Sequence, residues 1–136
     1  MPVRTKRWND PPQPDDGYRL LICRYRPRGV KKTDEPWDAW CPALGPSKEL
    51  HALAYGKTGE PPLSWKDYEK RFRAEMAGRA FWIAGFAKRV REGETITLLC
   101  SSACEDESSC HRSIVKELLE TAAFPEASKA PVVRRR

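Results

Sequence analysis

The chain of 136 residues has no long apolar run and little histidine. No stretch approaches the ~20 apolar residues that a membrane-spanning helix needs, and residues 1–7 lack the apolar core of a signal peptide. The five cysteines are an odd number, which excludes a complete set of disulfides within the chain. We therefore predict a cytoplasmic protein with no membrane partner and no structural disulfide.

The composition is that of one compact domain, with 40% hydrophobic and 32% charged residues. The net charge of +6 includes the three terminal arginines, Arg134–Arg136, so the rest of the surplus is small. Such a surplus fits attraction to phosphate or nucleic acid, or simply a solvated surface. We predict one domain over residues 1–124, a disordered basic tail over 125–136, and a monomer or weak dimer.

Two apolar segments, 18–25 and 95–101, have the pattern of buried strands, and residues 3–8 are a candidate third strand. Helices are predicted over 36–44, over 47–55 with Ser47 as its cap, over 64–90 with Ser64 as its cap and a break near Gly78, and from Cys110 onward. The two main strands are separated only by helices, which favours parallel, adjacent pairing through a right-handed crossover. The expected fold is α/β, a small three-layer domain with a mainly parallel sheet and helices on both faces.

Most of the unusual chemistry lies between residues 96 and 112, a pattern of strand, loop and helix. The loop after such a strand lies at the carboxyl edge of the sheet, where ligands bind in open α/β folds. Cys110 falls at the start of the helix, where the helix dipole and the nearby His111 and Arg112 lower a thiol pKa. We predict Cys110 and His111 as a catalytic pair, against the alternative that Cys110 merely packs under the loop.

A set of arginines follows the other main strand, at 24, 26 and 28. If the two strands are neighbours, these guanidiniums meet Arg112 and a helix N-terminus at one edge, and both features bind anions. The predicted anion-binding residues are Arg24, Arg26, Arg28, Gly29, Ser101, Ser102, Ser109 and Arg112. The alternative is that the arginines form salt bridges with the acidic residues of the 105–107 segment.

Three cysteines and a histidine in the order Cys100, Cys104, Cys110, His111 are also candidate zinc ligands. Their spacing differs from the paired arms of usual zinc sites, so we predict no metal and no cofactor. A cysteine phosphatase is disfavoured because seven residues separate Cys104 from Arg112 and the loop has no glycine to converge on an anion.

Several motifs together resemble the DUF488 (YeaO-like) family of bacterial proteins of unknown function. They include the GYRLLICRYRPRGVKK stretch over residues 17–32, the segment 46–50, the aromatic helix over 65–76, and the pairing of 97–100 with the Cys-His-Arg of 110–112. The resemblance spans roughly residues 3–120 and implies a small α/β bacterial domain. Cys23 stands where the family tends to have Asp, so any chemistry of that acid is missing here.

Two kinds of function follow from these residues. The first is a phosphate or nucleotide-like pocket at the carboxyl edge, in an enzyme that uses Cys110 and His111. The second is a binding module without catalysis, whose basic edge engages nucleic acid or an acidic protein. Convergence of the arginines into one cleft favours the first, and a stripe across a convex face favours the second.

Overall fold

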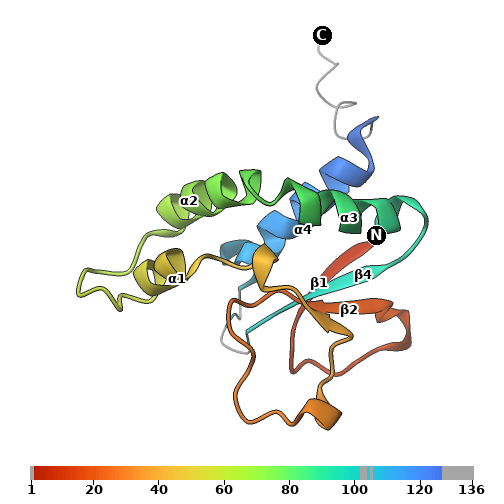
Figure 1. Cartoon of the computed structure of the whole chain (residues 1–136), viewed down its shortest axis with the longest axis horizontal. Helices are drawn as coiled ribbons and strands as arrows, with labels where there is room; N and C mark the ends of the chain where they lie inside the picture. Colours follow the sequence, from red (N-terminus) through yellow and green to blue (C-terminus); the bar gives the residue numbers. More distant parts are fainter. Residues whose placement is uncertain (1, 102–103, 105, 127–136) are drawn as a thin grey trace.

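A four-stranded parallel sheet forms the centre of the computed structural model, which describes residues 2–101, 104 and 106–126 (Figure 1). Its strands are β1 (Val3–Arg7), β2 (Tyr18–Leu21), β3 (Ala39–Trp40) and β4 (Ile96–Cys100). They lie in the order β1-β4-β2-β3, and all three neighbouring pairs are parallel. The predicted adjacency of the two main strands is confirmed, with Tyr18 opposite Ile96.

The described residues form four α-helices. They are α1 (Lys48–Ala54), α2 (Trp65–Ala77), α3 (Ala80–Arg91) and α4 (His111–Ala123). The hydroxyls of Ser47 and Ser64 accept hydrogen bonds from the backbone amides of Leu50 and Asp67, so both N-caps are as predicted. The predicted break falls at Gly78, the C-cap of α2. No helix within the described ranges is long and apolar enough to cross a membrane.

The two faces of the sheet are covered differently. Alternate strand residues, Leu20 and Leu98 among them, join the large apolar core that all four helices cover. In Figure 1, α2, α3 and α4 lie above the sheet and α1 lies to its left. Leu21 and Leu99 point to the other face and pack with Cys23, Trp37 and the loop residues Trp8 and Val30. The α/β class and the parallel sheet are confirmed. The expected helices on both faces are not seen in the described part of the chain, because α1 to α4 all pack on the face of Leu20 and Leu98. The other face is covered by proline-containing loops and short 3-10 turns, since proline removes backbone donors that an α-helix needs.

The predicted helix over 36–44 is wrong. This segment forms the short strand β3 and a 3-10 turn, η3 (Pro42–Leu44). The cause is the open edge of β2, whose carbonyl groups need donors. The amide of Asp38 donates to the Arg19 carbonyl at 2.7 Å, and the amide of Cys41 donates to the Leu21 carbonyl at 2.8 Å. Backbone pairing with the sheet therefore prevails over the apolar spacing of Trp37, Trp40 and Leu44.

A buried charge cluster fixes the turn between β1 and β2. Asp16 and Arg19 are both buried and form an ion pair, and the Lys6 ammonium lies 2.7 Å from the other Asp16 oxygen. The Asp16 carbonyl also accepts a hydrogen bond from the Thr97 hydroxyl of β4. Burial alone would raise the pKa of Asp16, but the Lys6 ammonium, the Gln13 amide and the Arg19 guanidinium hold it below its usual range.

Gly45 allows the loop after β3 to press against the end of β2. A Cβ at this position would lie 2.7 Å from the Ile22 carbonyl oxygen and 2.9 Å from the Arg24 amide nitrogen, and neither backbone atom can give way cheaply. We expect Gly45→Ala to lower the free energy of unfolding by about 1–3 kcal/mol, measured by denaturant titration.

Gly85 supplies the matched control for that substitution. It lies in the interior of α3 with no heavy atom within 4 Å of an added Cβ. Gly85→Ala should therefore raise the free energy of unfolding by up to about 1 kcal/mol, because alanine is the better helix former. Equal effects of the two substitutions would contradict the close approach at Gly45.

Candidate functional site

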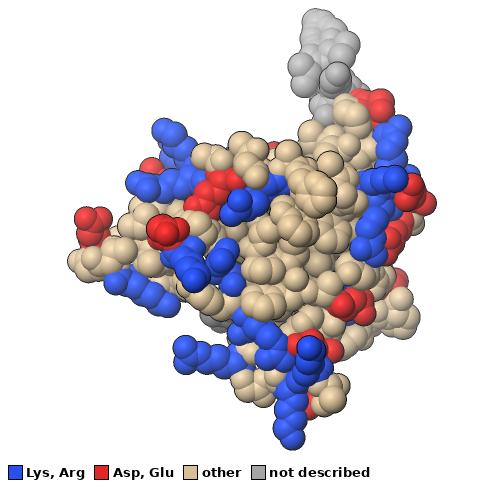
Figure 2. Space-filling view, viewed as in Figure 1, with Lys and Arg blue, Asp and Glu red and all other residues tan. Residues whose placement is uncertain are grey.

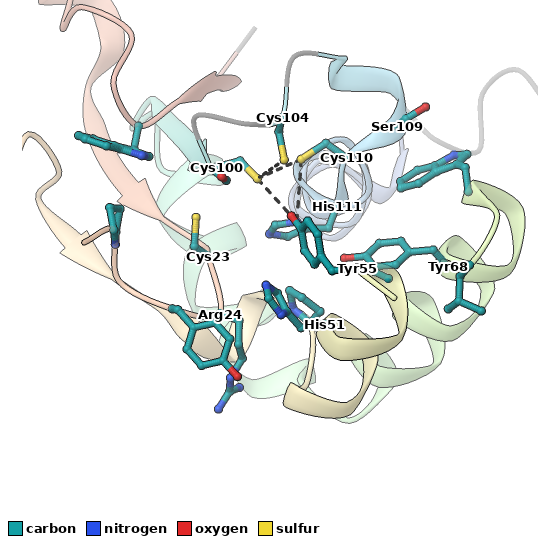
Figure 3. Close-up of a pocket in the computed structure, with 18 of the residues that line it drawn as sticks. Cys23, Arg24, His51, Tyr55, Tyr68, Cys100, Cys104, Ser109, Cys110 and His111 are labelled. Carbon is teal, nitrogen blue, oxygen red and sulfur yellow. Dashed lines mark hydrogen bonds between the residues drawn. The ribbon is translucent and has the colours of Figure 1, made fainter. Parts of the chain in front are cut away.

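A cavity of about 570 Å³ opens at the carboxyl edge of the sheet, where β2 and β4 end side by side (Figure 3). Its walls come from the loop after β2, from α1, from the start of α2, and from the segment that joins β4 to α4. Parallel neighbouring strands place their following loops at one edge, so the topology itself brings these distant segments together.

Three cysteine side chains form a cluster in the floor of this cavity. Cys100 is the last residue of β4, and Cys110 is the N-cap of α4. The Sγ atoms of these two residues are 3.0 Å apart, and the Cys104 Sγ lies 3.4 Å from that of Cys100. All three sulfur atoms lie within 4.8 Å of one another, and all three cysteines are free thiols. Figure 3 shows them converging above His111.

His111 is held in one tautomer by its surroundings. Its Nε2 lies 2.8 Å from the Ile22 carbonyl oxygen, which can only accept, so Nε2 carries the proton. Burial lowers the pKa of His111, and the ring is therefore neutral at physiological pH. Its unprotonated Nδ1 faces the Sγ atoms of Cys100 and Cys110 at 3.8 and 3.9 Å.

The three thiols differ in how readily they ionise. Hydrogen bonds from Cys100 and Cys110 lower the pKa of Cys104, the least buried of the three. As donors in these bonds, Cys100 and Cys110 have a raised pKa. The thiol with the lowered pKa is thus Cys104 in the loop, and not Cys110, to which the sequence assigned that property.

The walls of the cavity away from the cysteine cluster are basic and aromatic. Arg24, Arg28 and His51 line it, and among the described lining residues there is no Asp or Glu. Five aromatic side chains complete the walls: Trp8, Tyr25, Tyr55, Trp65 and Tyr68. Burial raises the pKa of Tyr68, so its hydroxyl stays protonated and can donate a hydrogen bond at neutral pH.

The structure brings together six of the predicted site residues. The cavity lining includes Arg24, Arg28, Ser101, Ser109, Cys110 and His111. Gly29 is exposed on the adjoining loop, and Ser102 lies outside the described residues. Their roles in binding and catalysis stay predictions.

Two predicted arginines lie outside the lining. Arg26 donates from Nε to Glu35 at 2.6 Å and from Nη2 to the Val30 carbonyl, with its guanidinium over the Trp37 ring. Arg112 is buried and donates from Nη2 to the Cys104 carbonyl at 3.2 Å. Both side chains brace the loops that form the cavity.

Several residues that the sequence did not predict as part of the site also line the cavity. They include Cys23, Trp8, Trp65 and His51. One signal was present in the sequence. His51 and Tyr55 are four residues apart on α1, which places them on one helix face, and their ring centroids are 4.6 Å apart.

The fold and the cavity define the class of protein. It is a small α/β domain with a parallel sheet and, at the carboxyl edge of that sheet, a pocket whose floor is formed by cysteine thiols. A family profile described as "Active DUF488-N3 subclade" matches residues 3–123, and the chain belongs to this DUF488 family. The resemblance found in the sequence motifs is therefore confirmed. No solved structure gives a significant match to the chain.

The curated relatives are themselves uncharacterised. The protein YeaO of Escherichia coli (strain K12) is 36% identical over 77 residues, which is 57% of this chain and 64% of YeaO. The protein Rv3073c of Mycobacterium tuberculosis (strain ATCC 25618 / H37Rv) is 32% identical over 74 residues, or 54% of this chain and 59% of that protein. These alignments cover less than two thirds of either relative, and the function of the family is unknown.

Proposed function

We propose that the pocket binds a small phosphate-bearing ligand with a flat ring, a nucleotide or a nucleotide-like compound. The observation that carries this proposal is the charge of the lining. Two arginines, Arg24 and Arg28, line the cavity, and the described lining residues include no carboxylate that would neutralise them. An uncompensated positive charge in a concave site attracts an anion, and a guanidinium pairs with phosphate through two parallel hydrogen bonds.

Arg24 supports an anion site most directly. Its Nε is buried without a hydrogen-bond partner among the described residues. Burial lowers the pKa of the neighbouring His51, and the positive charges of Lys57 and Arg24 lower it further. His51 is then neutral at physiological pH, so it can accept or donate a hydrogen bond beside the charged Arg24. A phosphate oxygen would satisfy the free guanidinium donor.

The flat part of the ligand is inferred from the aromatic walls and the volume. A cavity of about 570 Å³ lies within the range that accommodates compounds of nucleotide size. Tyr25 packs edge-on against His51 at 5.0 Å between ring centroids, and Trp65 stacks on Tyr68 at 5.4 Å. Planar side chains arranged in this way offer stacking surfaces for a purine or pyrimidine, as in proteins that bind single bases.

Calorimetric titration with AMP and with inorganic phosphate tests the anion site. We expect AMP to bind more tightly than phosphate, and Arg24→Ala to weaken both by roughly ten- to hundredfold, since hydrogen bonds to charged groups contribute about 1.5–3 kcal/mol. Arg28→Ala should act in the same direction. Arg71→Ala is the matched control, because Arg71 is exposed on α2 outside the cavity. Equal binding by all four proteins would refute the proposal.

The alternative, nucleic-acid binding, has its own supporting observation. Lys and Arg gather over the loop after β2 in the lower part of Figure 2, and Arg28, Lys31 and Lys32 are exposed there. Salt would weaken the binding of a nucleic acid to this edge. The logarithm of the affinity would fall linearly with the logarithm of the salt concentration, with a slope set by the number of phosphates contacted. A pocket for one nucleotide would instead show a shallow slope and no preference for longer oligonucleotides.

The proposal extends to the cellular compartment of the protein. Five free thiols, four of them buried, suit the reducing cytoplasm. We also propose a monomer or weak dimer, which sedimentation of the purified chain would check. The predicted catalytic pair, Cys110 and His111, lies in the floor of the pocket, so the floor offers either a reactive thiol or a metal centre to the ligand. The contacts favour the metal centre.

A further inference from the structure

We propose that Cys100, Cys104, Cys110 and His111 together bind one zinc ion in the floor of the pocket. This goes beyond the ligand proposed above and does not depend on it. The sulfur cluster and the histidine come from three structural elements: the end of β4, the loop that follows, and the start of α4.

The sulfur positions suit a tetrahedral ion. Zn–S bonds of about 2.3 Å place neighbouring sulfur atoms about 3.8 Å apart in a tetrahedron. The Cys100 Sγ lies 3.0 Å from that of Cys110 and 3.4 Å from that of Cys104, and no pair of the three sulfur atoms is more than 4.8 Å apart. Each separation is therefore within about 1 Å of the tetrahedral value.

The histidine has the hydrogen bonding of a metal ligand. Metal-bound histidines commonly donate their second ring N–H to a carbonyl or carboxylate, which fixes the ring and its tautomer. His111 donates from Nε2 to the Ile22 carbonyl at 2.8 Å and turns its Nδ1 lone pair toward Cys100 and Cys110. The Phe72 ring, 5.4 Å away between centroids, packs against the imidazole and restrains it.

The local backbone explains how adjacent residues can serve as ligands. Cys110 is the N-cap of α4 and has extended backbone angles, φ −136° and ψ 144°, whereas His111 is the first helical residue. The change from extended to helical backbone brings both side chains to one side, with the Cys110 sulfur and the His111 Nδ1 3.9 Å apart. Cys110 and His111 can therefore both reach one ion although no residue separates them, unlike the ligand pairs of usual zinc sites.

Arg112 supplies the charge that such a centre needs. Three thiolates and one Zn²⁺ carry a net negative charge, which is costly in a buried place unless a cation lies near. The Arg112 guanidinium is buried, donates to the Cys104 carbonyl, and has no carboxylate partner within 4 Å among the described residues. A cationic group bonded to the backbone of one cluster residue would stabilise the metal-bound form.

A four-ligand site of this kind is closed, as in structural zinc centres. It would tie the end of β4 to the start of α4 and, through the His111 hydrogen bond, to the end of β2. The three cysteines then serve as ligands and are protected from alkylation. Zinc thus gives the pocket a rigid floor beneath the bound ligand.

Metal analysis of the reduced, full-length protein purified without chelator tests the proposal. We expect about one zinc ion per chain in a site of this type. Cys104→Ser should lose it, and serine suits this half-buried loop position, so the variant should still fold. Cys104→His, which restores a nitrogen ligand, should regain it. Cobalt substitution should give the intense thiolate-to-cobalt absorption and tetrahedral d–d bands, both reduced in Cys104→Ser.

Cys41→Ser is the matched control, since Cys41 is a buried free thiol outside the cavity lining. It should keep its zinc. Loss of metal from Cys41→Ser as complete as from Cys104→Ser would overturn the proposal. So would rapid iodoacetamide labelling of the cluster in freshly purified protein, or a Cys100–Cys110 disulfide formed under reducing conditions; rapid labelling would support a reactive thiol instead.

Discussion

Phe72→Ala is expected to lower the free energy of unfolding by about 3–5 kcal/mol, the cost of truncating a buried phenylalanine. The Phe72 side chain has no exposed surface and lies in the main core beneath the helices. Its ring also stands between Tyr68 and His111, with centroid distances of 5.9 and 5.4 Å. The cavity left by truncation would therefore adjoin the pocket floor. Denaturant titration measures the stability loss.

Phe81 provides the comparison that separates burial from residue type. It is 80% exposed on α3, so Phe81→Ala should change the free energy of unfolding by no more than about 0.5 kcal/mol. The zinc content of Phe72→Ala is a second measurement, because the imidazole of His111 loses its packing partner. A stability loss as small as that of Phe81→Ala would contradict the position assigned to Phe72.

Asp16→Asn is expected to cost about 3 kcal/mol of stability at neutral pH, since removing one partner leaves a buried charge uncompensated. Arg19 would keep its positive charge at 6% exposure without the carboxylate that pairs with it. The neighbouring Asp15→Asn is the control. Asp15 is exposed and pairs with Arg4 at the surface, where such pairs contribute at most about 1 kcal/mol.

The pH dependence of this difference follows from the direction of the Asp16 pKa shift. The folded-state pKa lies below the ordinary value of 3.8, so the ionised carboxylate stabilises the fold fully above that pH. The stabilisation disappears as the pH falls through the folded-state pKa. Unfolding curves of the wild type and of Asp16→Asn should therefore differ most near pH 7 and converge below about pH 3.8. A constant difference across this range would exclude Asp16 as the cause.

Local sequence signals predicted the parts of the fold that depend on near neighbours. Ser47 and Ser64 were recognisable as caps, Gly78 as a break, and the β4 segment as a buried strand, because each depends on residue type and short spacing. The segment 36–44 was not predictable in this way. Its amides bond to carbonyls of β2 that are about twenty residues distant in sequence, and these bonds outweigh the helical pattern of its tryptophans.

The sequence predicted where the candidate site lies but not which residues form it. Parallel pairing of the two main strands was enough to place Arg24, Arg28 and Cys110 at one edge. The sequence could not distinguish Arg28, which enters the cavity, from Arg26, which turns away to bond Glu35. Ligand spacing in the sequence argued against a metal. The convergence of Cys100 and Cys110, on which the zinc proposal rests, depends on β4 and α4 meeting in three dimensions and was not predictable.

The central place of β4 has a consequence for how the protein is made. β1 and β2 leave the ribosome early, but neither pairs with the other; each waits for β4, whose Ile96 lies opposite Val3 on one side and Tyr18 on the other. Until that late segment is translated, the nascent chain carries two strands with unsatisfied edges, which other chains or chaperones can bind. Ile96 and Tyr18 are 78 residues apart, so assembly is also a long-range event that slows folding. The pocket, whose floor follows β4, is completed only after β4 and the start of α4 have been made.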